Sequence, residues 1–167
     1  ALGRAFTGLI LCGDSAGGIL TISTAIAWLD KPAALPVLMQ FPIYPRADAS
    51  KPYPSFAAFK DGHGLEGPNL DYYEAAYGAD KNSWRHSGIL ADQAGLPPTL
   101  VVTAEFDPLR DEGRAYAAKA IEAGVQVTYR ELKGTIHGFA SYRRAIPSAE
   151  GDFAELLEIA RAMIPRG

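Results

Sequence analysis

The chain has 167 residues, 48% of them hydrophobic and 21% charged, and its formal net charge is −3. Roughly 150 residues form a single core that buries about 68–70% of the unfolded surface, so we expect one domain over residues 1–167. Scattered lysines and arginines argue against a nucleic-acid partner, and no apolar run reaches the about 18 residues that a membrane span needs. No export signal is recognisable either, which predicts a cytoplasmic protein.

Short apolar runs and stretches with apolar residues at helical spacing alternate along the chain. Buried strands are predicted at residues 7–12, 36–45 and 99–108, and an alternating run predicts a fourth strand, nearer an edge, at 125–132. Helices are predicted at 16–29, 110–124 and 150–165. This order predicts an α/β protein with a mostly parallel sheet flanked by helices.

Residues 46–98 interrupt the alternation. The segment is rich in Gly, Pro, Asp and Ser, and its one helical stretch lies at 69–78. We expect a long, partly ordered excursion. Its tyrosines Tyr72, Tyr73 and Tyr77 lie at near-helical spacing, which is typical either of a helix that covers the sheet or of part of a cap over a site.

The motif Gly-Asp-Ser-Ala-Gly joins the first predicted strand to the first predicted helix. Gly13 and Gly17 supply the small residues that a sharp strand-to-helix turn needs, and Ala16 and Gly18 keep the following backbone narrow. Such a turn exposes Ser15 at a helix N-terminus, where unpaired N–H groups favour a developing negative charge. The motif indicates a nucleophile, although close packing of strand and helix also selects small residues.

A serine nucleophile needs a base, and the base needs a carboxylate that orients it. Asp107 follows the third predicted strand and His137 follows the fourth, so the three residues come in the chain order Ser, Asp, His. Two other acids compete with Asp107. Glu105 lies on the strand side of the loop, and Asp111 lies in the first helical turn, where an acid usually serves the helix dipole.

The remaining candidate residues have plainer interpretations. We expect His63 and His86, both inside the excursion, to face solvent. Cys12 is expected to be a small buried apolar side chain rather than a reactive thiol. For Asp14 two roles stay open: it tunes the electrostatics of the serine, or it holds the turn through backbone hydrogen bonds. No Cys/His cluster or His-Glu-x-x-His motif is present, so no metal site is predicted.

Four blocks of the sequence together resemble one family. They are GDSAGG at 13–18, FPIYP at 41–45, GLPPTLVVTAEFDPLRDEG at 95–113 and HGF at 137–139. In this order they are similar to the serial blocks of the hormone-sensitive lipase-like family of α/β-hydrolases, which includes bacterial carboxylesterases and acetylesterases. The resemblance extends over nearly the whole chain, and the third block is far more specific than the serine motif.

The resemblance implies an α/β-hydrolase fold and a role for each residue of the constellation. Ser15 would be the nucleophile, His137 the general base and later acid, Asp107 the group that orients the imidazole, and the N–H of Ala16 one oxyanion donor. Members of the family hydrolyse carboxylic esters, usually of short acyl chains, through an acyl-enzyme and without a cofactor. We therefore expect a serine carboxylesterase with a small-molecule ester as substrate.

In this family the loops that carry the acid and the histidine also line the acyl pocket. The resemblance therefore makes Leu109, Ile136 and Phe139 candidates for substrate binding, with core packing an equal alternative for Phe139. The excursion 46–98 would contribute to a cap.

The sequence departs from the family at its start. Family members carry a His-Gly-Gly-Gly stretch upstream of the serine, together with the first half of the sheet and part of the cap. None of these is found in this sequence. We expect the chain to correspond to the C-terminal portion of such a hydrolase, and the strand at 7–12 to have an unpaired flank. Such a flank predicts self-association or pairing with the missing N-terminal half.

Other functions of the same fold compete with the esterase. A serine peptidase would use this half as the end of a catalytic domain beside a propeller, but GDSAGG together with DPLRDEG favours esterases. A non-catalytic ligand-binding relative would lack the histidine that is present at 137. An inactive fragment of an esterase is a third alternative.

Overall fold

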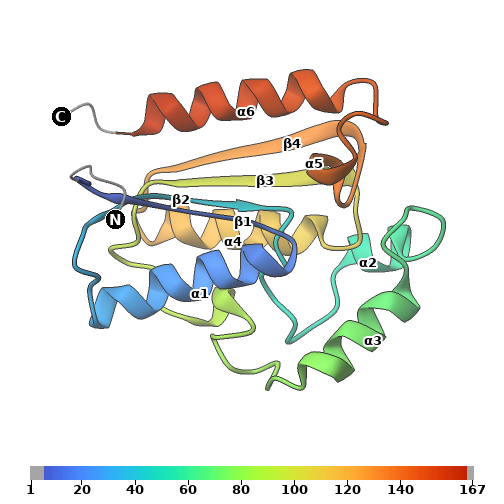
Figure 1. Cartoon of the computed structure of the whole chain (residues 1–167). Helices are drawn as coiled ribbons and strands as arrows, with labels where there is room; N and C mark the ends of the chain where they lie inside the picture. The colour runs from blue at the N-terminus through green and yellow to red at the C-terminus, as the bar shows by residue number, and fades with distance from the viewer. Residues whose placement is uncertain (1–5, 165–167) are drawn as a thin grey trace.

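The computed structural model describes residues 6–164, which form a four-stranded parallel sheet with helices on both faces (Figure 1). The strands lie side by side in their chain order. They are β1 (Leu9–Asp14), β2 (Val37–Ile43), β3 (Thr99–Phe106) and β4 (Val127–Ile136). Since all four are parallel, their carboxyl ends meet at one edge of the sheet, where ligand sites of open α/β sheets lie.

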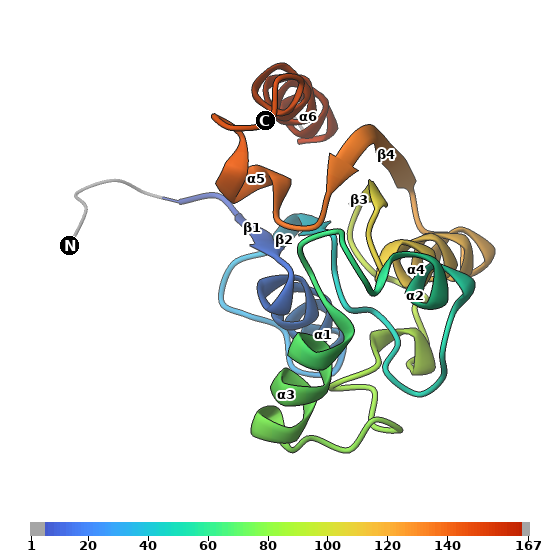
Figure 2. The same cartoon turned by 90° about the vertical axis from the view of Figure 1, so that its right-hand side faces the viewer.

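The helices divide between the two faces of the sheet. They are α1 (Ala16–Asp30), α2 (Pro54–Phe59), α3 (Gly67–Tyr77), α4 (Arg110–Glu122), α5 (Phe139–Tyr142) and α6 (Ala149–Met163), with a 3₁₀ turn at Gly88–Leu90. Figures 1 and 2 show α1 and α4 on one face and α6 on the other. The short α5 and the helices α2 and α3 lie toward the carboxyl ends of the strands.

The predicted α/β architecture is confirmed, with differences at the ends of elements and in short helices. The fourth strand, predicted at 125–132, extends as β4 to Ile136 and so ends directly before His137. The helices α2 and α5 were not predicted, because four to six residues are too few to establish a helical period. Helix α3 matches the helical stretch predicted inside the excursion.

A two-sided core holds the helices on the sheet. Along β3, Leu100 and Val102 belong to the cluster beneath α6, whereas Val101 belongs to the cluster shared with α1 and α4. This alternation follows from the two-residue period of a strand. All three side chains are fully buried, which explains why β3 reads as a continuous apolar run.

Strand β1 lies at the side of the described sheet and pairs only with β2 among the described strands. Its Ile10 side chain is 46% exposed, and Cys12 is exposed as well. The expectation that Cys12 is buried is therefore wrong for this chain, since no described element covers that part of the strand. Association through this flank stays a prediction.

None of the helices within residues 6–164 is long and apolar enough to cross a bilayer.

Helix α6 provides a test of the core beneath it. Leu156 is 1% exposed and packs in the core, whereas its neighbour Leu157 is 41% exposed. We expect Leu156→Ala to lower the free energy of unfolding by about 2–5 kcal/mol, because it removes buried methyl groups and leaves a cavity. Leu157→Ala should stay within about 0.5 kcal/mol of the parent chain. Urea denaturation of both variants measures the difference, and equal losses would contradict this packing.

Candidate active site

The turn between β1 and α1 is backbone-strained at Ser15. The residue adopts φ 52° and ψ −114°, in a region that side-chain-bearing residues rarely occupy. Backbone hydrogen bonds hold it on both sides: the Ser15 N–H donates to the Ile43 carbonyl at 2.9 Å, and the Ser15 carbonyl accepts from the N–H groups of Gly18 at 2.9 Å and Ile19 at 3.4 Å. This strained turn is what the Gly-x-Ser-x-Gly motif predicts, and it directs the hydroxyl toward the carboxyl edge of the sheet.

The glycines of the motif are not equivalent. A Cβ atom on Gly13 would lie 2.3 Å from the Gly17 carbonyl oxygen, and one on Gly18 would lie 2.7 Å from Cβ of Pro45. A Cβ atom on Gly17 would meet nothing closer than a carboxylate oxygen of Asp14, at 3.9 Å. Sterics within the described chain therefore require glycine at 13 and 18, but not at 17, where the sequence also predicted the need for a small residue.

The structure brings Ser15, His137 and Asp107 into one hydrogen-bonded chain. His137 Nε2 lies 2.8 Å from Ser15 Oγ, and His137 Nδ1 lies 2.8 Å from Asp107 Oδ2. A carboxylate only accepts, so Nδ1 carries the proton and Nε2 is left to accept from the serine hydroxyl. The fully buried Asp107 uses its other oxygen to accept the Leu109 N–H at 2.8 Å.

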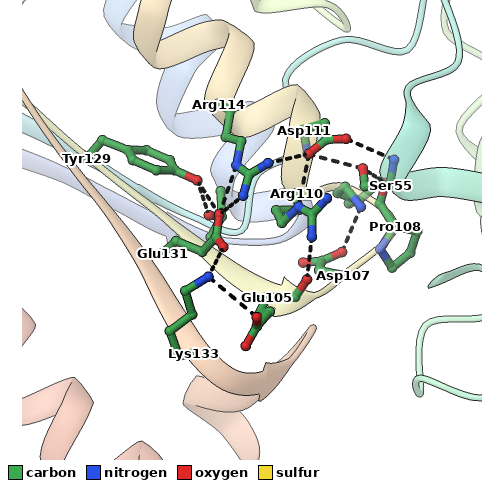
Figure 3. Close-up of polar contacts among 12 residues, drawn as sticks. Ser55, Glu105, Asp107, Pro108, Arg110, Asp111, Arg114, Tyr129, Glu131 and Lys133 are labelled. Atoms are coloured by element: carbon green, nitrogen blue, oxygen red, sulfur yellow. Dashed lines mark hydrogen bonds and ion pairs between the residues drawn. The ribbon is translucent and has the colours of Figure 1, made fainter. Parts of the chain in front are cut away.

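The two competing acids have other partners. Glu105 accepts the Gly134 N–H at 2.8 Å and pairs with Lys133 on the outer side of β4. Asp111 accepts from Arg110 and from the Ser55 N–H (Figure 3). The described hydrogen bonds of His137 include neither acid, so Asp107 alone of the three candidates faces the imidazole.

The turn that carries Asp107 is clamped to α2 by a residue that the sequence did not single out. Ser55, fully buried at the start of α2, donates from Oγ to the Pro108 carbonyl at 2.9 Å. The same Oγ accepts the Asp111 N–H at 3.1 Å, and the Ser55 N–H donates to the Asp111 carboxylate at 2.9 Å (Figure 3). The excursion thus fixes the turn after β3. No local pattern marks Ser55, since its partners lie more than fifty residues away.

Two cavities open on either side of Ser15. The larger one, of about 630 Å³, is walled mainly by apolar side chains of α1, α3 and the acid turn, among them Ile19, Leu70 and Leu109. The second, of about 550 Å³, lies beside the histidine loop and α5, with Ile136 in its wall.

Two of the three pocket candidates from the sequence therefore line a cavity, Leu109 the larger and Ile136 the smaller. Phe139 lines neither. It is fully buried and packs edge-on against Tyr44, so the alternative of core packing is the one observed.

Helix α3 forms part of the wall of the larger cavity and does not cover the sheet. Figures 1 and 2 show it beyond α1, away from the strands. Tyr73 and Tyr77 line this cavity, whereas Tyr72 is 69% exposed and does not line it. The excursion therefore contributes side chains next to Ser15.

A buried ionic cluster anchors α3 to the body of the protein. Glu74 of α3 pairs with Arg46 at 2.5 Å and with His86 at 2.9 Å, and Arg46 also contacts Glu112 of α4 at 3.2 Å. Burial alone would raise the pKa of Glu74, but the hydrogen bond from His86 and the charge of Arg46 hold it below its usual range. Glu112 is more deeply buried, and desolvation raises its pKa to about 8 despite Arg46.

Both remaining histidines differ from the sequence expectation. His86 is 2% exposed, because Glu74 supplies a partner for its ring from another element. His63 is half-buried, and its ring stacks on Phe106 at the end of β3. The described hydrogen bond of Asp14 is to a side chain and not to the backbone of the turn: its carboxylate accepts the Tyr44 hydroxyl at 3.1 Å. Its electrostatic effect on Ser15 stays a prediction.

Comparison with known proteins agrees with this geometry. A family model described as alpha/beta hydrolase fold matches residues 1–141. The chain belongs to the alpha/beta hydrolase fold family. The predicted resemblance to the hormone-sensitive lipase-like group of this family is confirmed by curated carboxylesterase relatives.

Two of these alpha/beta hydrolase relatives are similar over nearly the whole chain. The carboxylic ester hydrolase LipN of Mycobacterium tuberculosis is 34% identical, over 92% of this chain and 43% of the relative. An ethyl acetate hydrolase of Pseudomonas putida is 35% identical, over 95% of this chain and 51% of the relative. A solved hyperthermophilic esterase of the archaeon Pyrobaculum calidifontis superposes with a TM-score of 0.85 at 31% identity, over 92% of this chain and 52% of that one. The chain spans about half the length of the curated relatives it matches.

Gly17, the last residue of the motif, and Gly18, directly after it, both lie in the first turn of α1 and give a matched test of the turn. We expect Gly18→Ala to lower the free energy of unfolding by about 1–3 kcal/mol, because the new methyl group overlaps Pro45. Gly17→Ala, one residue earlier and in open space, should instead be neutral or stabilise by up to about 1 kcal/mol through its higher helix propensity. Thermal or urea unfolding distinguishes them, and a tolerated Gly18→Ala would refute the steric requirement.

Proposed function

We propose that this chain carries the catalytic centre of a serine carboxylesterase that hydrolyses short-chain acyl esters through an acyl-enzyme. The observation that carries the proposal is the continuous hydrogen-bonded chain from buried Asp107 through His137 to Ser15. The strained turn at Ser15 and the similarity to carboxylic ester hydrolases support it. The relatives favour an esterase over a peptidase of the same fold.

In the proposed reaction Ser15 Oγ attacks the ester carbonyl carbon while His137 Nε2 takes its proton. The tetrahedral intermediate collapses, the C–O bond to the alcohol breaks, and His137 returns the proton to the leaving alcohol. Water then attacks the acyl-enzyme with His137 again as base, which releases the acid and restores the serine. The steps balance with ester and water alone, so no cofactor is invoked.

Asp107 and Ala16 have supporting roles in this scheme. Asp107 holds the imidazole by Nδ1 and stabilises the imidazolium that forms at each proton transfer. Ala16 is the first residue of α1, so its N–H has no partner within the helix and is available to a developing oxyanion next to Ser15.

The larger cavity is the proposed site of the acyl chain, with Leu109 in its wall. Its lining is mainly apolar and it reaches Ser15, as an acyl group bonded to the serine requires. We assign the smaller cavity, with Ile136, to the alcohol side, because it also contacts His137, which protonates the leaving alcohol.

The nucleophile is tested by covalent labelling and turnover. The chain should react with a p-nitrophenyl alkylphosphonate to gain one adduct by intact mass, and should hydrolyse p-nitrophenyl butyrate. Ser15→Ala should lose both reactions, whereas Ser23→Ala, at a serine of α1 that lines neither cavity, should retain them. Asp107→Asn should reduce turnover by about 10⁴-fold, as in serine-protease triads. An adduct that persists in Ser15→Ala would contradict the assignment of the nucleophile.

The acyl assignment is tested by chain length. Leu109→Phe adds bulk to the larger cavity, so kcat/KM should fall more for p-nitrophenyl hexanoate than for the acetate. One methylene in such a pocket changes kcat/KM by about 10- to 200-fold. Ile136→Phe is the matched control: it should leave the acyl-length profile unchanged and instead discriminate among acetates of longer alcohols. If Leu109→Phe instead changed the preference among alcohols and Ile136→Phe changed the acyl-length profile, the assignment of the two cavities would be reversed.

A further inference from the structure

Tyr44 is the second backbone-strained residue with a side chain in the described structure. It directly follows β2, is 1% exposed and adopts φ 35°, which is unusual for a bulky residue. Its N–H donates to the Val102 carbonyl of β3 at 2.6 Å. Strain of this kind persists only where the surroundings impose it, and it is concentrated at functional sites.

The ring of Tyr44 lies against the imidazole of His137. The two ring centroids are 4.7 Å apart and the planes are tilted by 56°. On another side, Phe139 meets the Tyr44 ring edge-on at 5.1 Å and is itself fully buried. Tyr44 therefore fills the space between the apolar core and the imidazole, so that its ring has one fixed position.

The hydroxyl of Tyr44 is tied to the residue that precedes the nucleophile. It donates to Asp14 Oδ2 at 3.1 Å. Burial, together with the negative charge of Asp14, raises the pKa of Tyr44, so the phenol keeps its proton and remains a donor. Because the partner of the hydroxyl is an anion, the phenol ring is more electron-rich than that of a free tyrosine.

An electron-rich ring beside an imidazole acts most strongly when the imidazole is charged. The face of a tyrosine ring attracts a cation within about 6 Å of its centroid. In the proposed esterase reaction His137 becomes such a cation each time it takes a proton, while its two nitrogens are engaged by Ser15 and Asp107. Neither of these hydrogen bonds prevents the His137 imidazole from tilting out of its plane. The fixed ring of Tyr44 beside it does.

We propose that Tyr44 is a positioning residue of this site: its ring fixes the imidazole of His137 and stabilises the imidazolium form, and its tie to Asp14 keeps that ring in place. The proposal rests on the proposed esterase function only for the origin of the imidazolium during turnover. The contact itself is present without substrate, so it can be tested independently of activity.

The charged and titratable groups near the imidazole belong to several elements. They are Asp107 after β3, Asp14 at the end of β1, Tyr44 after β2, Tyr73 of α3 and Tyr142 of α5. A test that varies the electron density of the ring at position 44, and leaves the other groups as they are, isolates the contribution of this ring.

The decisive experiment is a series of rings of nearly constant shape at position 44. Tyr44→Phe is the reference, and trifluoro- and pentafluorophenylalanine at the same position progressively withdraw electrons from the ring face. In each protein the His137 imidazole is titrated by NMR, with its signal identified by its absence in His137→Gln. The pH dependence of Ser15 labelling by the phosphonate is measured in parallel.

If the ring stabilises the imidazolium, the NMR titration and the acidic limb of labelling should both move to lower pH as fluorination increases. Labelling at the plateau should fall by about 10-fold across the series, the size of a partly buried cation–π contact. A purely structural ring would leave both curves unchanged, because shape and packing are retained. Titration and labelling that are independent of fluorination would overturn the proposal.

Two further variants test the positioning role. Tyr44→Leu removes the ring and should reduce labelling by about 10²-fold, as expected for a displaced catalytic group. Tyr72→Leu, at an exposed tyrosine of α3 that lines neither cavity, should label like the parent chain. A Tyr44→Leu protein that folds and labels at the parent rate would contradict the positioning role, and the fluorinated series decides the question if that variant does not fold.

Failure of this proposal and failure of the esterase proposal are distinguishable. If Ser15 of the parent chain is not labelled, the esterase assignment fails for this chain, whereas the NMR titration still reports whether the Tyr44 ring stabilises the His137 cation. If Ser15 is labelled but the NMR titration of His137 does not change with fluorination at position 44, the esterase proposal stands and the role of Tyr44 is refuted.

Discussion

The burial of the Asp107 carboxylate is the constraint on which the geometry of the site depends. A buried carboxylate is strongly destabilising unless hydrogen-bond donors replace its lost water. Here the donors are the Leu109 N–H, within the same turn, and Nδ1 of His137, at the end of the next strand. The first bond fixes the turn and the second fixes the imidazole, and the direction of the imidazole then determines that Nε2 faces Ser15.

Parallel pairing makes this arrangement possible. Because β1, β2, β3 and β4 lie side by side and all run in one direction, the segments after them converge on one edge. The two strained residues, Ser15 and Tyr44, follow the neighbouring strands β1 and β2, and each is held by a backbone hydrogen bond to the strand beside it. The sheet thus imposes the strained conformations that the site uses, at an energy of about 1–3 kcal/mol for each residue.

The excursion between β2 and β3 contacts the carboxyl edge of the sheet in two places. Ser55 of α2 clamps the turn that carries Asp107, and α3 walls the larger cavity, anchored by the contact of Glu74 with Arg46 and His86. The opposite charges of Arg46 and Glu74 are largely buried together, so each compensates the other. The wall of the larger cavity and the position of the acid turn therefore both depend on a segment that contributes no strand to the sheet.

The sequence by itself determined the parallel α/β architecture and the approach of Ser15, Asp107 and His137, because strand periods, turn glycines and chain order are local signals, and parallel strands bring their ends together. Only the tertiary structure decided which loop and strand residues are buried and what they contact. His86 and Phe139 are buried by partners from other elements, Cys12 is exposed at the side of the described sheet, and Tyr44 meets His137 across the sheet edge. These outcomes depend on contacts between residues far apart in the chain, which no local pattern of apolar, polar or turn residues records.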